Sequence, residues 1–176
     1  CLITDDPYRV KMIAAHYLDN VEIFTELRGQ VGLIGKFNGI PLIVLSVGIG
    51  ITSTRAYLTE LCSKKKIKRI VYLGDCITQD SSLSVGSITY ISKAYENDQS
   101  FLASENLFKY VENIMRNNNI NAGASVTTTN DNYLIEKKYI TSEESKVLDF
   151  TTSAIYRFNF ADIETLSILI VCENVI

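Results

Sequence analysis

Two short segments carry residues that could do chemistry directly after apolar runs. In SVGIGITS, residues 46–53, Gly48 and Gly50 precede a run with helical spacing. The N–H groups at a helix N-terminus favour negative charge, so this turn could hold a phosphate, although a tight strand-to-helix turn needs the same glycines. In RIVYLGDCITQD, residues 69–80, Asp75 follows Gly74 where we expect an apolar strand to run out into a loop. A carboxylate there would repel an anion bound nearby.

Strands and helices that alternate along the chain are expected to position these segments. Apolar runs rich in β-branched residues predict strands, and apolar residues three or four apart predict helices. This alternation predicts one layered α/β domain with a largely parallel sheet, whose strands end around a common crevice. The predicted strands are residues 1–4, 21–27, 31–37, 40–47, 69–73, 87–92, 122–129, 147–150 and 166–172, with a hairpin turn at Gly39, and the predicted helices are residues 5–20, 51–66, 104–117 and 151–160.

Composition and net charge indicate which kinds of binding partner to expect. The 176 residues, 47% hydrophobic and 21% charged, suit one globular domain. A net charge of −3 and a pI near 5.2 provide no basic field of the kind that attracts nucleic acid or an anionic membrane surface, so we expect neither as a partner. The basic run Lys64–Lys66 is interpreted as a solvated helix end that complements the helix dipole.

The cysteines and the length of the apolar runs favour a cytoplasmic protein. The four cysteines are widely spaced and form no CxxC pair, which argues against a disulfide or zinc framework and fits a reducing compartment. No apolar run approaches the roughly 20 residues that cross a bilayer as a helix.

Three segments resemble the motifs of a known family. Residues 5–20, DDPYRVKMIAAHYLDN, resemble G-D-P-x-R-x-x-x-I-A. Residues 28–61 resemble R-G-x-x-G-x-x-G-x-x-x-G followed by G-M-G-x-x-S and E-L, and residues 72–78, YLGDCIT, resemble R-x-G-T-C-G. By these motifs the chain is similar to the nucleoside phosphorylases of the purine nucleoside phosphorylase and uridine phosphorylase type.

The resemblance implies a fold, an assembly and a reaction. The fold would be a three-layer α/β/α domain over residues 1–176 with a mixed, partly barrel-like sheet, lacking the family's extreme N-terminus and C-terminal helices. The assembly would be a homodimer or a trimer of dimers, with residues 28–39 at or near the interface. In the reaction, phosphate is the co-substrate that attacks C1′ of a nucleoside, giving free base and ribose 1-phosphate without a metal or organic cofactor.

The resemblance assigns part of a phosphate site and shows where the motif is changed. Arg9 and Arg28 match two phosphate-binding arginines, the second of which relatives contribute across the dimer, and Gly48 and Gly50 belong to the glycine-rich turn. A planar guanidinium suits phosphate because it donates two parallel hydrogen bonds. Three positions depart from the motif: Asp5 replaces its first glycine, Tyr72 its third arginine and Asp75 a hydroxyl donor.

The nucleoside site is assigned in the same way. Tyr133 matches the aromatic residue that stacks on the base, and Ile49 is expected to form part of the same apolar wall. Phe150 stands where the family has the methionine that packs on the sugar, and Thr151 stands where it has the carboxylate that binds the ribose hydroxyls. Glu173 is the candidate for the acid that protonates the departing base.

These departures lead us to expect a protein that binds purine nucleosides or bases, with phosphorolysis impaired or absent. An active purine nucleoside phosphorylase, which would be a glycosyltransferase, remains an alternative. A phosphate-independent nucleosidase and a uridine phosphorylase are further alternatives. The Gln-x-Arg base clamp of the uridine-cleaving branch is absent from the sequence, which favours purines.

Overall fold

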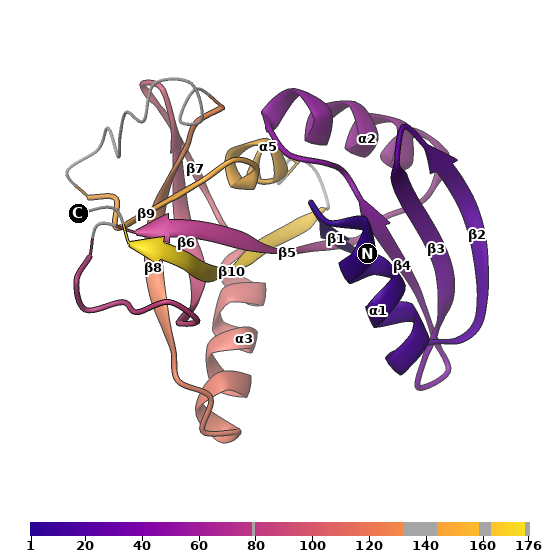
Figure 1. Cartoon of the computed structure of the whole chain (residues 1–176), viewed down its shortest axis with the longest axis horizontal. Helices are drawn as coiled ribbons and strands as arrows, with labels where there is room; N and C mark the ends of the chain where they lie inside the picture. Colours follow the sequence, from indigo (N-terminus) through magenta and orange to yellow (C-terminus); the bar gives the residue numbers. More distant parts are fainter. Residues whose placement is uncertain (79, 132–143, 159–162, 175–176) are drawn as a thin grey trace.

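The computed structural model describes residues 1–78, 80–131, 144–158 and 163–174 (Figure 1). Helices and strands alternate along most of this length, as the hydrophobic pattern predicts. The strands are β1 (Leu2–Thr4), β2 (Asp19–Leu27), β3 (Gln30–Phe37), β4 (Ile40–Ser46), β5 (Arg69–Thr78), β6 (Ile88–Glu96), β7 (Gln99–Leu102), β8 (Ala122–Thr129), β9 (Val147–Asp149) and β10 (Glu164–Asn174), and the helices are α1 (Pro7–Tyr17), α2 (Ile51–Lys64), α3 (Glu105–Asn117) and α5 (Thr152–Tyr156).

The strands form one mixed sheet that closes on itself at one end. Its order is β10-β6-β8-β9-β5-β1-β4-β3-β2, with β7 paired to β6. Strand β10 also pairs with β5, so β5, β10, β6, β8 and β9 make a closed ring of pairings. The antiparallel hairpin β2–β3–β4 extends the sheet away from this ring, and Gly39 takes a φ of +80° in the predicted turn. The mixed, partly barrel-like sheet is therefore confirmed. The expectation of a largely parallel sheet is wrong, because the pairs β2–β3, β3–β4, β5–β9, β6–β7 and β6–β10 are antiparallel.

Helices cover both faces of the sheet. Val10, Ile13 and Ala14 of α1 pack with Val44 of β4 on one face. Leu58 and Leu61 of α2 pack with Leu45, Ile155 and other core residues on the opposite face. Because Val44 and Leu45 are adjacent in β4 and strand side chains alternate, these two clusters must lie on opposite faces. The resulting α/β/α layering matches the expected fold (Figure 1).

Strand β5 runs further than the sequence pattern indicates. Residues 69–73 were expected to end in a loop at Gly74, but β5 continues to Thr78 because it pairs with β10 as far as Asn174 and with β9 at Ile77 and Thr78. Asp75 is therefore part of a strand, so the pairing of β5 with β10 and not a loop fixes its backbone position.

Three smaller expectations are also corrected. Helix α2 ends at Lys64 and α5 at Tyr156, and both are shorter than predicted. Strand β7 was not predicted, because its four residues are too short for a clear pattern.

None of the helices among the described residues combines the length and apolar character needed to cross a membrane.

Candidate active site

Neighbouring strands end together at one edge of the sheet. Strand β1 lies between β4 and β5, and the N–H of Val47 donates to the carbonyl of Thr4 at 2.8 Å just beyond the paired residues. Asp6 then begins helix α1 as its N-cap, accepting a hydrogen bond from the N–H of Tyr8 at 2.8 Å, and Pro7 occupies the first turn. This sharp strand-to-helix connection turns Arg9 back towards the strand ends.

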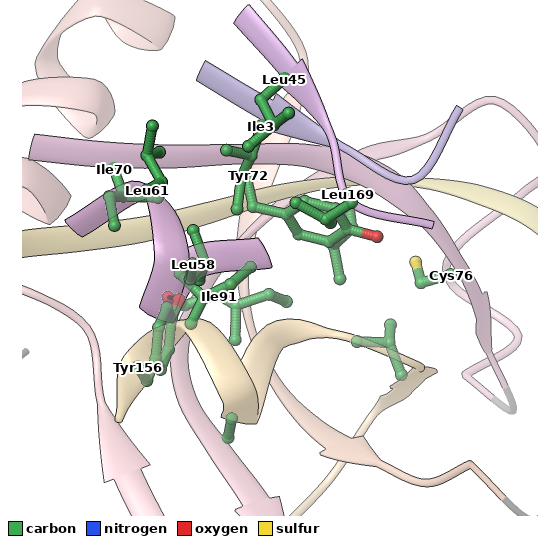
Figure 2. Close-up of a cluster of buried hydrophobic side chains, with 14 of the residues drawn as sticks. Ile3, Leu45, Leu58, Leu61, Ile70, Tyr72, Cys76, Ile91, Tyr156 and Leu169 are labelled. Atoms are coloured by element: carbon green, nitrogen blue, oxygen red, sulfur yellow. Dashed lines mark hydrogen bonds between the residues drawn. The ribbon is translucent and has the colours of Figure 1, made fainter. Parts of the chain in front are cut away.

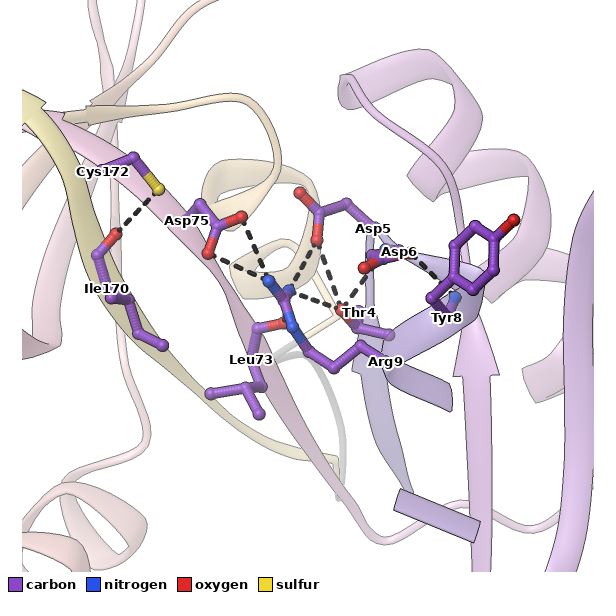
Figure 3. Close-up of polar contacts among 9 residues, drawn as sticks. All are labelled: Thr4, Asp5, Asp6, Tyr8, Arg9, Leu73, Asp75, Ile170 and Cys172. Atoms are coloured by element: carbon purple, nitrogen blue, oxygen red, sulfur yellow. Dashed lines mark hydrogen bonds and ion pairs between the residues drawn. The ribbon is translucent and has the colours of Figure 1, made fainter. Parts of the chain in front are cut away.

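The guanidinium of Arg9 is surrounded by acceptors of its own chain (Figure 3). Its Nη1 donates to Thr4 Oγ1 at 2.8 Å, to Asp5 Oδ1 at 2.9 Å and to the Leu73 carbonyl at 3.1 Å. Its Nη2 donates to both carboxylate oxygens of Asp75, at 3.0 and 3.1 Å. The side chain of Arg9 is only 15% exposed. Both outer nitrogens of this guanidinium are thus already engaged. We refer to Arg9, Asp5 and Asp75 as the Arg9 cluster.

The Arg9 cluster carries more negative than positive charge. One guanidinium faces two carboxylates, one of them on each side. Burial raises the pKa of Asp5, and the charge of Asp75 adds to that rise although Arg9 opposes it. The two residues that replace the motif's glycine and hydroxyl donor therefore make this edge unfavourable for an additional anion.

Tyr72, at the position of the family's third arginine, is a core residue. Its side chain is 1% exposed and packs in the main apolar cluster with Ile3, Leu45 and Leu169 (Figure 2). Burial raises its pKa, and the charges of nearby carboxylates add to the effect. A Cβ placed on Gly74 would collide with the Tyr72 ring and hydroxyl. The side chain of Tyr72 therefore covers Gly74, and an aromatic ring fills the place that the motif gives to a cation.

The glycine-rich turn before α2 is next to a carboxylate of the same chain, that of Asp131. Gly48 and Gly50 have φ values of +72° and +102°, which favour glycine. The N–H of Ile51, at the start of α2, donates to the two carboxylate oxygens of Asp131 at 2.9 and 3.2 Å. Sequence reasoning did not single out Asp131, although it stands in the segment TTNDNYL that carries the aromatic motif. The positive end of the α2 dipole is therefore next to a carboxylate of the same chain, Asp131, and phosphate binding by Gly48 and Gly50 stays a prediction.

Residues 149–152 include the position at which the motif has its ribose-binding carboxylate, and they are largely buried and hydrogen-bonded to one another. The carboxylate of Asp149 accepts from the N–H groups of Thr151 and Thr152, both at 2.7 Å, and from Thr127 Oγ1 at 2.6 Å. Thr151 is 0% exposed, and Phe150 is half-buried. Asp149 therefore joins β8, β9 and α5, which is a structural role. Thr151 offers one hydroxyl where the motif has a carboxylate.

The remaining predicted site residues are not all brought together. Ile49 is 62% exposed, and Arg28 lies in the β2–β3 turn with a φ of +54°. Arg28 lines a groove of about 460 Å³ together with Ser53 and Tyr57 of α2, and the described lining of this groove includes no member of the Arg9 cluster. Tyr133 lies outside the described residues.

The end of β10 reaches the same edge as Asp75. Glu173 pairs in register with Ile77 of β5, after an irregularity at Cys172. Burial raises the pKa of the Cys172 thiol, and the neighbouring charge of Asp75 adds to the rise. The backbone of Glu173 is thus close to the Arg9 cluster, whereas its side chain lies outside what the structure describes. Among the described residues, His, Cys, Asp and Glu side chains form no group of three or more suited to a metal ion.

The chain thus places glycine-rich turns and an arginine at the carboxyl edge of a mixed α/β/α sheet, which is where ligands bind in open α/β folds. The sequence profile described as "Phosphorylase superfamily" matches residues 1–135, and the chain belongs to that family.

Curated relatives agree with this assignment. A DeoD-type purine nucleoside phosphorylase of Aliivibrio fischeri is 30% identical over 131 residues, which cover 68% of this chain and 55% of that protein. The DeoD-type enzymes of Bacillus velezensis and of Buchnera aphidicola are 37% and 36% identical over 75 and 87 residues, covering 43% and 49% of this chain and 32% and 37% of theirs. The chain thus spans between about a third and just over half of the length of these relatives.

Proposed function

We propose that this chain binds a purine nucleoside or its free base at the carboxyl edge of the sheet, and that its phosphorolysis is impaired or absent. The observation that carries the proposal is the state of Arg9, whose outer nitrogens are bound by Asp5, Asp75, Thr4 and Leu73. Membership of the phosphorylase superfamily and the purine-directed names of the relatives support the choice of ligand.

Phosphate binding would be opposed by electrostatics. A phosphate that reached Arg9 would have to displace two carboxylates and would then lie beside them. Two like unit charges about 4 Å apart cost about 4 kcal/mol at an effective dielectric near 20. No compensating cation stands at position 72, where Tyr72 is buried in the apolar core.

The ribose would also be held less firmly. Phosphorolysis develops positive charge on the sugar, and preorganised negative groups stabilise such a transition state. At position 151 the chain supplies one threonine hydroxyl, and the carboxylate of Asp149 is committed to Thr127, Thr151 and Thr152. Glu173 remains the proposed acid for the leaving base, with Tyr133 and Phe150 as proposed contacts of the nucleoside and no cofactor required.

The assay for base release from inosine, run with and without phosphate, tests this proposal. We expect no phosphate-dependent release of hypoxanthine, while calorimetric titration detects binding of inosine or hypoxanthine. Rapid release that requires phosphate would instead identify an active purine nucleoside phosphorylase. Release without phosphate would identify a nucleosidase, and cleavage of uridine a pyrimidine-directed enzyme. The first and third results contradict the proposal, whereas the second agrees with absent phosphorolysis and would add hydrolysis to the proposed function.

We further propose that the protein is at least a homodimer, or a trimer of dimers, with the hairpin of β2, β3 and β4 at the interface. Strand β2 ends the sheet and leaves Ile23 and Leu27 62% and 56% exposed, and Ile40 of β4 is 68% exposed. Apolar side chains along an unpaired sheet edge are typical of a surface that another chain covers. Only monomer at micromolar concentration in light scattering would contradict this.

The compartment and the domain organisation are part of the same proposal. The four cysteines are free thiols, which supports a reducing, cytoplasmic environment. We propose that residues 1–176 form a single domain of this fold, because one sheet includes all the described strands.

A further inference from the structure

A group of lysines follows α2, and the helix dipole accounts for only part of it. Helix α2 ends at Lys64, and the N–H of its C-cap residue, Lys65, donates to the Leu61 carbonyl at 2.9 Å. Cations within the last turn are stabilised by the helix dipole, but the effect fades beyond that turn. Lys66 and Lys68 lie outside the helix, in the connection to β5. Their positive charges are therefore not explained by the helix end.

Three of the cations in this segment have no acidic partner among the described residues. Lys64 Nζ pairs with Glu60 at 2.6 Å, and Arg69 Nε pairs with Glu164 at 2.7 Å. The structure gives Lys65, Lys66 and Lys68 no comparable ion pair within its described part. The segment thus presents three ammonium groups without an ion-pair partner in the described part of a protein whose net charge is −3.

These lysines line a concave surface with an apolar floor. The cavity has a volume of about 510 Å³, and its lining residues are Cys62, Ser63, Lys64, Lys65, Lys66, Ile67, Lys68 and Ile163. Cys62, Ile67 and Ile163 pack against the main core, which fixes the floor. The described lining contains no carboxylate. A cleft with one sign of charge and low-dielectric walls concentrates the electrostatic potential.

The backbone around the cavity is held in place by the sheet. The N–H of Glu164 donates to the Lys68 carbonyl at 2.8 Å, and the N–H of Ile67 donates to the Lys65 carbonyl at 3.0 Å. Glu164 pairs in register with Arg69 at the amino ends of β10 and β5. The Arg9 cluster lies further along β5, at Asp75, towards the carboxyl ends of these strands. The lysine cavity is therefore separate from the candidate active site.

We propose that the lysine cavity binds a small ligand that carries a polyphosphate chain, such as a nucleoside di- or triphosphate or inorganic tripolyphosphate. Ammonium groups bind phosphate oxygens as point charges without the fixed geometry of a guanidinium, so neighbouring lysines can follow a chain of phosphates. The volume is in the range of about 300–1,000 Å³ that small-molecule sites occupy. The acidic remainder of the protein disfavours a long polyanion, which would extend beyond the cavity.

Calorimetric titration of the full chain with inorganic tripolyphosphate tests the proposal. At about 50 mM salt we expect saturable binding that weakens by about tenfold or more at about 200 mM, because screening acts on exposed charges. The triple variant Lys65→Gln, Lys66→Gln and Lys68→Gln is expected to lose about tenfold or more in affinity. Replacement of the same three residues by Arg should preserve binding, which separates the loss of charge from any loss of structure.

The matched control removes three lysines elsewhere: Lys11→Gln, Lys109→Gln and Lys146→Gln. It changes the net charge equally, and we expect it to retain the affinity of the parent. An equal loss in the control, or no binding by the parent at low salt, would overturn the proposal. Titration with adenosine triphosphate then distinguishes the source of the phosphate chain. If adenosine triphosphate binds more tightly than tripolyphosphate, and only the lysine-to-glutamine variant of the cavity loses this binding, the apolar floor contacts the base. If the two ligands bind with equal affinity, the site recognises the phosphates only.

Discussion

Two ionic clusters in this molecule have opposite balances of charge. In the Arg9 cluster one guanidinium faces two carboxylates, Asp5 and Asp75. In the second, which we call the Glu96 cluster, one carboxylate faces the guanidiniums of Arg55 and Arg157, at 2.8 and 3.3 Å. Ser153 Oγ also donates to Glu96, at 2.8 Å. The Glu96 cluster joins α2, β6 and the segment of α5, whereas the Arg9 cluster joins α1 to the strand ends.

The pKa values of the two carboxylates move in opposite directions. Burial acts to raise the pKa of Glu96, but the Ser153 hydroxyl and the two guanidiniums outweigh it and hold the pKa below its usual value. Burial raises the pKa of Asp5, with Asp75 adding to the rise and Arg9 opposing it. An excess of cations thus makes the Glu96 cluster a stabilising link between elements. In the Arg9 cluster the carboxylates are in excess, so the guanidinium is already paired with groups of its own chain.

The largest effect is expected from removal of the shared carboxylate in the Glu96 cluster. Glu96→Ala leaves two partly buried guanidiniums and the Ser153 hydroxyl without their acceptor, which should lower the free energy of unfolding by about 2–3 kcal/mol. Urea denaturation measures this. Glu60→Ala is the control, because it removes only an exposed pair with Lys64 and should cost about 0.5 kcal/mol or less. Equal losses in the two variants would show that the Glu96 cluster contributes no more than a surface pair.

A smaller loss is expected when the cation of the Arg9 cluster is removed. Arg9→Met leaves Asp5 and Asp75 facing each other without a counter-charge, and we expect a loss of about 1–2 kcal/mol. The cost is limited because the Asp75 side chain is 41% exposed and can remain hydrated. Adding Asp75→Ser to Arg9→Met should recover part of the loss in a double-mutant cycle. If Lys11→Met, in the exposed part of the same helix, costs as much, the Arg9 cluster has no special role in stability.

The pH dependence should separate the two clusters by sign. The folded pKa of Glu96 is below its ordinary 4.5, so its contribution is present above that value and is lost as pH falls through the folded pKa. The folded pKa of Asp5 is above its ordinary 3.8, so its contribution is full below that value and is lost as pH rises through the folded pKa. Relative to the parent, Glu96→Gln should therefore become less destabilising as pH falls.

Asp5→Asn should show the reverse trend, gaining stability relative to the parent as pH rises from about 4 towards 7. Urea denaturation of the parent and both variants across this range measures the two slopes. Slopes of the same sign would mean that the two carboxylates are not in opposite electrostatic environments.

Much of the fold was predictable because the hydrophobic pattern reflects burial directly. Val10, Ile13 and Ala14 recur at helical spacing and are buried, and the apolar runs of β4, β5 and β10 lie in one sheet as expected. The end of β5 was not predictable, because pairing with β10 and β9 overrides the local break at Gly74. Helix α2 buries Thr54, a polar residue that the hydrophobic pattern does not select, because packing and not polarity alone determines the inner face.

The candidate site was only partly predictable. The motifs identify which positions matter, and the departures at Asp5 and Asp75 are visible in the sequence. That both carboxylates bind Arg9 depends on the turn into α1 and on the register of β1 with β5, which no local pattern contains. The capping of α2 by Asp131 is a contact between residues 80 apart in sequence, and only the folded structure brings them together.

Calorimetric titration with inorganic phosphate of the parent and of the double variant Asp5→Gly with Asp75→Ser tests the central claim most directly. The two changes restore the motif's glycine and a hydroxyl donor and release Arg9 from both carboxylates, so we expect phosphate to bind at least about tenfold more tightly than to the parent, with a gain that shrinks as salt rises. The control, Asp19→Ser with Asp98→Gly, removes two exposed carboxylates elsewhere and should leave the affinity unchanged. Phosphate binding by the parent that equals binding by the double variant would contradict the claim that its own carboxylates close this site to phosphate.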